Sequence, residues 1–479
     1  MEIKIEKIDN NRWLIPKTGN MRVPGMIFSS PLLIDEVREG QSINQVANVS
    51  TLPGIVGYSL AMPDIHWGYG FPIGGVAAFQ LDEGIVSPGG VGYDINCGCR
   101  LMTTGLYASD IKPYIRDVIL SLYRDIPLGV GKGGKIRLSK GDEAMVALEG
   151  AAWAVKKGYG SREDLSRTED HGVMSGADPD ALSERAVKRG LDQLGTLGSG
   201  NHFLEIQVVD DIYDKKTADR FNLHEGMITV FLHTGSRGFG HQICDDFLKK
   251  MSEKPQIRGF TLPDRQLACA PIRSDTGRKY LSAMACAANY AWANRQILMH
   301  LAHESMLRAL GTDPVTLRMS LLYDVSHNII KMEHHMMDNK KALLCIHRKG
   351  ATRSFPPGHE NLPDMYKDTG QPVLIPGDMG TCSYVLAGDH GAMEQSFGSS
   401  CHGAGRTLSR SIAIKKAQGR SIQKELEAKG IFVQARGKHT LKEEMPEAYK
   451  DVSQVVEAVY QAGLARKVAR LRPLGVIKG

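Results

Sequence analysis

The sequence predicts an α+β protein that folds as one compact unit. Short apolar runs typical of strands, such as residues 228–232, occur along the chain together with helical periodicity, as in 280–310. Neither an internal repeat nor a linker rich in Pro, Gly or Ser divides the chain. Length is only a soft guide to the number of domains, so we expect one domain over residues 1–479 rather than three.

The composition is that of a globular protein, with 42% hydrophobic and 23% charged residues. The net charge is only +6, from 59 basic and 53 acidic residues, so it permits a polyanionic partner without demonstrating one. The eight cysteines follow no secreted disulfide spacing. Since the first residues do not resemble a signal peptide and no apolar run could span a bilayer, we expect a cytoplasmic protein without membrane contact.

The N-terminal segments are expected to lead into a cleft. Alternating apolar and polar residues in 1–30 predict a strand and a turn, and 32–47 is predicted to form a short helix. Asp64, His66 and the glycine-rich run 68–75 predict an irregular loop before a strand. His66 could be a ligand, but a histidine beside a tryptophan is more often packed structure.

Residues 84–101, GIVSPGGVGYDINCGCRL, form the stretch around which the chain is organised. Its proline and glycines predict a sharp turn that a ligand can approach closely. Asp94 and Cys97 stand on this turn three residues apart, where a carboxylate and a thiol could bind one metal ion. The alternative is a capping aspartate and a small buried cysteine. We expect this turn and the preceding loop to line one cleft.

Residues 109–124 have the pattern of an amphipathic helix, and the segment after it partly matches a phosphate-binding motif. Gly129, Gly134 and Lys135 fit G-x-x-x-x-G-K, but Ile136 occupies the place of the Ser or Thr that binds magnesium, and the next residues are strand-like. We therefore reject a P-loop. The basic residues of this segment are candidates for phosphate contacts, with a solvated basic turn as the alternative: Lys132, Lys135 and Arg137.

The middle of the chain delivers polar side chains from strand ends. Residues 141–195 are expected to be mainly helical, with an exposed polar insert at 158–172. His202 and Glu205 follow, at the start of a predicted strand over 203–209. Because alternate residues of a strand face opposite ways, they point to different sides or lie on a bend.

Two further histidines end apolar strands. Strand 228–232 leads to His233 and then to Arg237 in a glycine turn, and the strand in LLYDVSHN leads to His327 and Asn328. A histidine at a strand end before a turn is well placed to bind a ligand.

Residues 280–310 predict the longest helix, in the core and ending at Gly311. Its H-x-x-H-E order does not match the zinc motif H-E-x-x-H, so these three residues are assigned to the helix surface: His300, His303 and Glu304. His334 and His335 are also expected at the surface.

His402 stands in SSCHGAGR, where small residues follow it. They would let a phosphate approach the imidazole and the N–H groups of a helix expected to start there. That helix would carry the following basic residues: Arg406, Arg410, Lys415 and Lys416. Valines at helical spacing between 452 and 459 predict the core face of another helix.

Five candidate metal ligands thus share a strand-end or glycine-turn context: Asp94, Cys97, His202, His233 and His327. A single histidine of this kind is more often structural than a ligand, but the shared context favours a common site. Five ligands exceed the roughly three protein ligands of one open catalytic zinc. They suit two ions that share Cys97, because a thiolate can bridge.

Seven motifs carry a resemblance to a known family: GIVSPGGVGYDINCGCR, GSGNHFLEI, HTGSRGFG, DVSHN, HRKGATR, IPGDMGT and SSCHGAGR. In this order they resemble the RtcB family of GTP-dependent RNA-splicing ligases, almost from end to end. The resemblance implies a single RtcB-type domain over 1–479, with mixed and antiparallel sheets flanked by helices around a central metal cleft.

The resemblance also implies the roles of individual residues. One Mn²⁺ would bind Asp94, Cys97 and His202, the other Cys97, His233 and His327, and His402 would be guanylylated. The implied GTP contacts are Asn201, His202, Phe203, Leu204, Glu205, His327, Asn328, Pro376, Gly377, Asp378, Met379, Ser383, His402, Gly403, Ala404, Gly405 and Lys478. Candidate contacts with RNA phosphates are Arg237, Lys349, Arg353 and Arg406.

The implied activity joins an RNA 3′-phosphate or 2′,3′-cyclic phosphate to a 5′-hydroxyl, through a GMP-histidine and then a guanylylated RNA 3′ end. The expected substrates are tRNA exon halves or broken RNA ends, and the family implies an archease-type helper. Glu205 could read guanine, with a strand-end salt bridge as the alternative. Asp378 departs from the family pattern, which often has Ser or Thr there. From the residues alone, zinc or iron would suit the ligands as well as manganese.

Two other classes remain open at the level of sequence. A dinuclear phosphoesterase would open cyclic phosphates without ligation, but it has no use for a phosphate-exposed His402. A non-enzymatic RNA-binding protein is poorly supported by the aromatic content of 6% and the mild charge.

Overall fold

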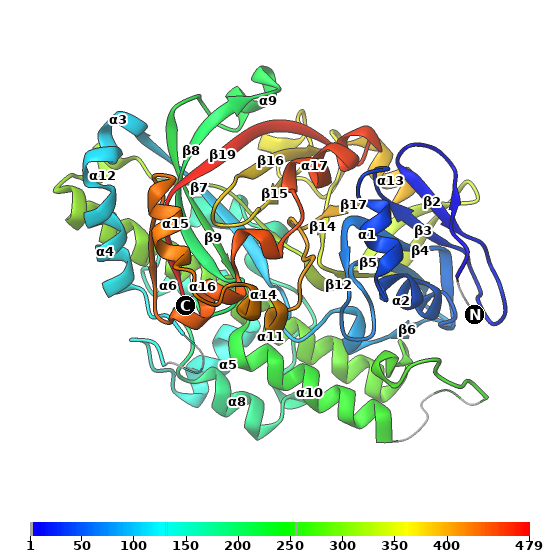
Figure 1. Ribbon diagram of the computed structural model, residues 1–479. Coiled ribbons are helices and arrows are strands. Elements are labelled where there is room, and N and C mark those ends of the chain that lie inside the picture. Colours follow the sequence, from blue (N-terminus) through cyan, green and yellow to red (C-terminus); the bar gives the residue numbers. More distant parts are fainter. Residues whose placement is uncertain (1–2, 130, 132, 254–256, 258) are drawn as a thin grey trace.

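The computed structural model describes residues 3–129, 131, 133–253, 257 and 259–479. Within them, two large sheets and a set of helices build a single α+β body, which confirms the predicted fold class (Figure 1). Two short two-stranded pairings, β6 with β10 and β14 with β17, complete the sheets that these residues form.

The eight-stranded sheet has the order β11-β7-β9-β8-β19-β16-β15, and β18 pairs with β19. These pairings are antiparallel except β18 with β19, which is parallel. Its strands are β7 (Gly98–Tyr107), β8 (Phe203–Ile212), β9 (Met227–Thr234), β11 (Ser320–Ser326), β15 (Pro372–Ile375), β16 (Ser383–Gly388), β18 (Phe432–Ala435) and β19 (Ala465–Lys478).

The seven-stranded sheet has the order β1-β2-β3-β4-β5-β13-β12, and only β3 with β4 is parallel. Its strands are β1 (Glu6–Lys7), β2 (Arg12–Ile15), β3 (Gly25–Phe28), β4 (Ile55–His66), β5 (Ile73–Gln80), β12 (Asn328–Met337) and β13 (Lys340–Lys349). The short pairs consist of β6 (Ile85–Val86), β10 (Ala270–Pro271), β14 (Ala351–Arg353) and β17 (Ser399–Cys401).

The helices cover the faces of these sheets (Figure 1). They are α1 (Ile34–Glu39), α2 (Ser42–Val49), α3 (Ala108–Ile111), α4 (Ile115–Asp125), α5 (Lys140–Glu149), α6 (Ala151–Lys156), α7 (Arg162–Ser166), α8 (Glu184–Gly190), α9 (Lys215–Arg220), α10 (Arg237–Glu253), α11 (Asp275–Leu310), α12 (Pro314–Leu317), α13 (His390–Gln395), α14 (Arg410–Lys416), α15 (Ile422–Ala428), α16 (Lys438–Glu443) and α17 (Val452–Gln461). No helix in the described part of the chain is long and apolar enough to cross a membrane.

Every residue of β9 is buried, because both faces of the eight-stranded sheet are covered. On one face, Val230 shares a core with Ile119 of α4 and Leu298 of α11. On the other, Phe231 shares a core with Ala413 of α14. A strand covered on both faces has a continuous apolar sequence, which explains the run ITVFL at 228–232.

The predicted long helix is confirmed as α11. The side chain of Ser274 caps its N-terminus by accepting a hydrogen bond from the N–H of Gly277, and the helix ends at Gly311, whose φ of 58° is left-handed. The valines predicted to form a core face lie on α17 and pack against strands of the seven-stranded sheet.

Strand pairing brings the ends of four strands to one place. Gly98 pairs with Thr234 and with Ser326, and Phe203 pairs with His233. The turn before β7, the start of β8, the end of β9 and the end of β11 therefore meet. His327 joins β11 to β12, so the chain crosses there from one large sheet to the other.

A buried arginine on α11 forms hydrogen bonds with several of the segments that meet here. The Arg295 guanidinium donates to the backbone carbonyls of Asn96 (2.7 Å) and Thr234 (3.0 Å) and to the side-chain oxygen of Asn96 (3.0 Å). It also forms a bidentate ion pair with Asp324, at 2.8 Å to each carboxylate oxygen. Both side chains of the pair are fully buried. One cation thus ties the Asp94–Cys97 turn to β9 and β11.

Several local predictions were wrong. The helix predicted over 32–47 is two helices, α1 and α2, which are separated at Gly40. The helix predicted over 109–124 is interrupted at Pro113, which lies between α3 and α4. Asp64 and His66 lie in β4 rather than in a loop. The segment after Gly134 forms no strand over the described residues 133–139.

The polar insert at 158–172 was predicted to be exposed, but part of it is buried. Glu169 is 1% exposed because its carboxylate accepts hydrogen bonds from Lys331 and from the N–H and hydroxyl of Ser326. His335, predicted at the surface, is also buried and faces Glu333, whereas His334 is exposed. For Glu169, partners that the fold brings from distant segments override local polarity, whereas His335 contacts a neighbour on its own strand, β12.

We expect Arg295→Met to lower the free energy of unfolding by about 3–5 kcal/mol, since it removes the donor to two buried carbonyls and leaves the buried Asp324 carboxylate with only one of its two cations, Arg100. Urea unfolding followed by circular dichroism measures this change. The matched control is Arg278→Met, an exposed arginine on the same helix, which should unfold like the wild type. Equal stabilities of the two variants would contradict the role of Arg295.

Candidate metal centre and active site

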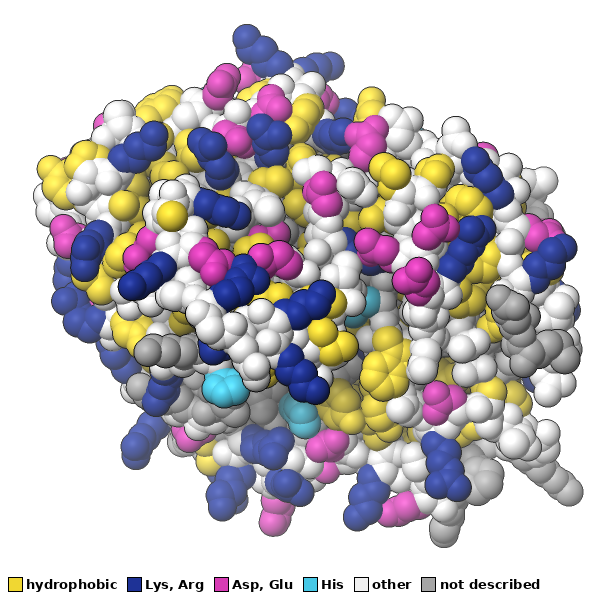
Figure 2. All heavy atoms as spheres, in the orientation of Figure 1, with side chains coloured by type: hydrophobic (Ala, Val, Ile, Leu, Met, Phe, Trp, Pro, Cys, Tyr) yellow, Lys and Arg dark blue, Asp and Glu magenta, His cyan; other side chains and the backbone are white. Residues whose placement is uncertain are grey.

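A cavity of about 370 Å³ opens where the strand ends meet. Its wall combines the Asp94–Cys97 turn with the beginning of β8, the His327 junction and the segment after β17. Figure 2 shows a hollow near the centre of this face of the molecule, with basic and hydrophobic side chains around it and a histidine visible within. The two loops that were predicted to line one cleft both contribute, through His66, Tyr69 and Asp94 among others.

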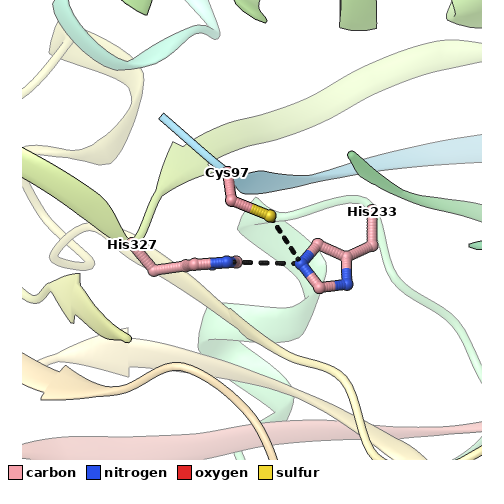
Figure 3. A group of neighbouring side chains, drawn as sticks. All are labelled: Cys97, His233 and His327. Carbon is pink, nitrogen blue, oxygen red and sulfur yellow. Dashed lines mark hydrogen bonds between the residues drawn. The ribbon is translucent and has the colours of Figure 1, made fainter. Parts of the chain in front are cut away.

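Cys97, His233 and His327 form the first group of possible metal ligands. The Cys97 sulfur lies 3.2 Å from Nε2 of His233, which lies 3.2 Å from Nε2 of His327. Figure 3 shows Cys97 and His327 pointing toward His233 from separate segments of the chain. All three are buried. Their donor atoms converge on one point, as binding of a single ion requires.

Asp94, Cys97 and His202 form the second group. Nε2 of His202 lies 2.8 Å from Oδ2 of Asp94 and 3.4 Å from the Cys97 sulfur. Gly235 makes room for the carboxylate, because a Cβ at that position would lie 2.5 Å from Oδ1 of Asp94. Cys97 belongs to both groups, so the structure brings together the five side chains expected from the sequence around one shared sulfur.

The protonation states of these side chains fit metal binding. Burial lowers the pKa of His233 and of His327 well below the usual value, so both imidazoles are neutral and offer lone pairs. Burial, followed by the charge of Asp94, raises the pKa of Cys97, and a bound cation would reverse this by stabilising the thiolate. A thiolate, neutral imidazoles and a carboxylate are together a donor set for divalent transition metals.

His402 follows β17 and faces the metal ligands, with its ring centroid 4.9 Å from that of His327. Nδ1 of His402 donates to Oδ2 of Asp64 at 2.5 Å, and the same oxygen accepts from the backbone N–H groups of His402 (3.0 Å) and Gly403 (3.3 Å). Burial alone would raise the pKa of Asp64, but His402 and these hydrogen bonds lower it. An ionised Asp64 keeps the proton on Nδ1 and leaves the Nε2 lone pair free.

Glu205 and Lys478 lie in another part of the same cavity. The Glu205 carboxylate accepts a hydrogen bond from Gln207 (2.7 Å), whose amide nitrogen also donates to the hydroxyl of Ser383 (3.1 Å). Burial raises the pKa of Glu205 to about 8. Lys478 lies over the Phe203 ring, 5.8 Å from its centroid, and its charge partly offsets the effect of burial on the pKa of Glu205. The Glu205 carboxylate can accept hydrogen bonds from a ligand in the cavity.

Comparison with known proteins decides the family. The model of the family described as tRNA-splicing ligase RtcB matches residues 45–479. The chain belongs to the RtcB family. It is 51% identical to a tRNA-splicing ligase RtcB of Archaeoglobus fulgidus over the whole of both chains. It is 50% identical to that of Thermococcus kodakarensis over 100% of this chain and 99% of the relative. An RNA-splicing ligase RtcB of Mycobacterium tuberculosis is 53% identical, over 91% of this chain and all of its own.

Most of the nucleotide contacts that the RtcB resemblance implies line the cavity; the exceptions are His202, Leu204 and Ser383. Leu204 is fully buried in the core on the other face of β8, as strand alternation requires. The Ser383 hydroxyl lies behind the wall, where it accepts hydrogen bonds from Gln207 (3.1 Å) and from the N–H of the wall residue Gly377 (3.4 Å). Asp378, the departure from the RtcB pattern, accepts hydrogen bonds from the N–H of Gly380 (2.8 Å) and the hydroxyl of Thr381 (2.7 Å), so its carboxylate shapes its own turn.

Two of the expected phosphate contacts lie at the cavity wall. Arg406 donates to Glu444 (3.0 Å) and lies over the ring of Tyr449. Lys349 donates to the backbone carbonyls of Phe71 (3.1 Å), Gly89 (3.1 Å) and Tyr69, and burial lowers its pKa to about 7. Both cations therefore already have protein partners, because the Arg406 guanidinium also donates to the carbonyls of Leu408 (3.1 Å) and Glu443 (2.8 Å), and the Lys349 ammonium holds three carbonyls.

The other two lie outside the wall. Arg237 is behind His202, with Nη1 at 2.9 Å from Nδ1 of that imidazole. Arg353 is 3% exposed and pairs with Glu169 (3.3 Å) and Asp170 (3.0 Å), which contradicts its predicted contact with phosphate. Its guanidinium neutralises these two carboxylates of the polar insert at 158–172, which allows that part of the insert to be buried.

The remaining candidates are dispersed. Lys135 and Arg137 are exposed, with Lys135 at a separate hollow, and Lys132 lies outside the described residues. His66 lines the cavity, but its Nδ1 is 2.9 Å from the carbonyl oxygen of Asp64, and burial lowers its pKa to about 4. The helix expected directly after His402 begins only at Arg410, so its N-terminus does not adjoin that histidine.

Asp64 is the site residue that sequence reasoning missed. Only its fold position reveals its contact with His402, which is 338 residues away. The available signal was a carboxylate within the apolar strand SLAMPDIH, since a buried carboxylate needs a partner.

If two ions both bind Cys97, removal of its thiol should weaken the binding of both ions, whereas removal of the His202 imidazole should weaken the binding of one. We expect the wild type to bind two Mn²⁺ per chain, His202→Ala to bind one, and Cys97→Ala to lose tight binding at both sites. Equilibrium dialysis with metal analysis measures the stoichiometry. Cys286→Ala, a buried cysteine of α11, is the matched control and should keep two ions. Equal stoichiometry for His202→Ala and Cys97→Ala would contradict the shared sulfur.

Proposed function

We propose that this protein is an RNA ligase, with residues 1–479 acting as one RtcB-type domain. It would join an RNA 3′-phosphate or 2′,3′-cyclic phosphate to a 5′-hydroxyl at the expense of GTP. The observation that carries the proposal is His402: its Nε2 is free, its Nδ1 is held by Asp64, and the ring lies beside the two groups of metal ligands. The names of the relatives support the activity, and the resemblance supports GTP as co-substrate.

Asp94, Cys97 and His202 would hold one Mn²⁺, and Cys97, His233 and His327 the other. Bound there, the metal pair would neutralise phosphate charge and lower the pKa of a coordinated hydroxyl. The choice of manganese rests on the family resemblance, because the donor set also suits other transition metals.

In the first step, Nε2 of His402 attacks the α-phosphorus of GTP. An N–P bond forms, the bond from the α-phosphorus to the bridging oxygen breaks, and pyrophosphate leaves. Positive charge develops on the imidazole, and the Asp64 carboxylate stabilises it through Nδ1–H. Glu205 would accept hydrogen bonds from N1–H and the exocyclic amine of guanine, which favours its ionised form.

In the second step, a phosphate oxygen of the RNA 3′ end attacks the phosphorus of the GMP-histidine, the N–P bond breaks, and His402 leaves as a neutral imidazole whose Nδ1–H still donates to Asp64. Water first opens a 2′,3′-cyclic phosphate. In the third step, the 5′-hydroxyl attacks the RNA 3′-phosphorus, and GMP leaves as the phosphodiester forms. Activation is needed because a phosphate monoester has no adequate leaving group. Covalent catalysis thus divides one hard displacement into easier ones.

A phosphoesterase that opens cyclic phosphates would need only the metal ligands. In this protein the Asp64 carboxylate also accepts three hydrogen bonds from His402 and Gly403, which fix the orientation of the imidazole. A histidine held in this way is suited to act as a nucleophile, which the phosphoesterase would not need. The RNA substrate class and an archease-type helper stay predictions from the resemblance.

The direct test is incubation with α-labelled GTP and Mn²⁺. The wild type should retain acid-labile label on the protein, as expected for an N–P bond, and His402→Ala should retain none. His300→Ala, a histidine of α11 away from the cavity, is the control and should label normally. An unlabelled wild type that still opens cyclic phosphates would contradict the ligase and support the phosphoesterase.

Asp64→Asn should leave the hydrogen-bonded geometry nearly intact but remove the charge that faces His402. We expect the rate of guanylylation to fall roughly 10²- to 10⁴-fold, with little change in the GTP concentration needed for half-maximal rate. Single-turnover labelling at several GTP concentrations measures both. Asp35→Asn, an exposed aspartate of α1, is the matched control. A rate equal to that of the wild type would contradict the role of Asp64.

A further inference from the structure

Two tyrosine rings line the cavity beside the metal ligands and take no part in the proposed steps. Tyr69 and Tyr93 both contribute to the wall, and Tyr93 directly precedes Asp94. Their ring centroids are 5.6 Å apart, with an angle of 66° between the planes. His241 of α10 stacks on Tyr93 at 4.6 Å and 28°. We call Tyr69, Tyr93 and His241 the aromatic shelf.

The aromatic shelf is held in place by the backbone around it. The buried Lys349 ammonium donates to the carbonyls of Tyr69 and Gly89, and so fixes the two loops that carry the tyrosines. The N–H of Gly70 donates to Gln266 (2.9 Å), which anchors the first loop again. Rings fixed before a ligand arrives lose little conformational entropy when it binds.

The charges near the aromatic shelf favour a base over a phosphate. Asp245 lies at the shelf, with Oδ2 3.7 Å from Nδ1 of His241. Burial raises the pKa of Tyr69, and the nearby carboxylates of Asp264 and Asp245 raise it further. These carboxylates would repel a phosphate, whereas the ring faces remain suited to stacking. Every nucleobase has a π-face, so such stacking is tolerant of sequence.

We propose that the aromatic shelf stacks the terminal base of the RNA strand that carries the 3′-phosphate. This inference rests on the proposed function. The 3′-phosphate must reach both His402 and the metal ligands, and its own nucleoside must then lie next to them. Glu205 is assigned to the guanine of GTP, and Lys478 lies beside it in the cavity. Tyr93 adjoins the metal ligand Asp94, so the shelf is where a base attached to that phosphate finds partly exposed rings.

The test uses the full-length protein carrying labelled GMP on His402. It is mixed with a short RNA whose 3′-phosphorylated terminal nucleoside either carries its base or is abasic, and transfer of label to RNA is followed against RNA concentration. For the wild type, the abasic strand should bind roughly 5- to 100-fold more weakly, the value of one stacked base. The Tyr69→Leu/Tyr93→Leu variant should treat both strands alike, whereas Tyr69→Phe/Tyr93→Phe should discriminate like the wild type.

A second experiment places the abasic nucleoside at the 5′-hydroxyl end of the other strand. The wild type should ligate this strand as well as the strand that carries its base. Equal discrimination by the leucine and wild-type proteins, or an effect confined to the 5′-hydroxyl strand, would overturn the inference. If the double leucine variant takes up no label from GTP, the single variants Tyr69→Leu and Tyr93→Leu carry the same comparison. A wild type that takes up no label refutes the proposed function itself, whereas labelling without any effect of the base refutes only the shelf.

Discussion

The site depends on one buried cation. Arg295 projects from α11 and donates to Asn96 in the metal-binding turn, to Thr234 at the end of β9 and to Asp324 in β11. Asn96 has a positive φ of 51°, which places the turn in a conformation that few non-glycine residues adopt. The guanidinium compensates for this by satisfying both the backbone and the side chain of Asn96. Because a planar guanidinium forms several hydrogen bonds in fixed directions, one residue can align three separate segments.

Antiparallel strand pairing brings together ligands that are far apart in the sequence and belong to no single motif. His202, His233 and Cys97 lie at the ends of neighbouring strands of one sheet, and His327 lies where the chain passes to the other sheet. His402 comes from a third place, after β17, and is oriented from β4 by Asp64. Reactive groups carried on paired strands keep their separation, which is what a metal pair and a nucleophile acting on one phosphate require.

The sequence predicted those residues whose role is visible in a local motif, and it did not predict contacts between residues that are far apart in the chain. Asp94, Cys97, His202, His233 and His327 stand in glycine turns or at strand ends, so their types and positions predicted a common centre before any fold was known. The α+β class and the long helix were also predictable, because apolar period and caps are local. Asp64, the burial of Glu169 and the pairing of Arg353 were not, since each depends on a partner brought close only by the fold. The start of α14 was misplaced because the segment after His402 is irregular, with Gly405 at a φ of 75° and Arg406 bridged to Tyr449, and the helix begins only at Arg410.

We propose that two metal ions share Cys97 next to a histidine that receives GMP on Nε2. Anomalous diffraction from crystals grown with Mn²⁺ and GTP would locate both ions and the nucleotide. We expect two manganese peaks, both within bonding distance of the Cys97 sulfur, and continuous density from Nε2 of His402 to phosphorus. A single peak, a second ion away from Cys97, or a nucleotide that leaves His402 bonded only to Asp64 would contradict it.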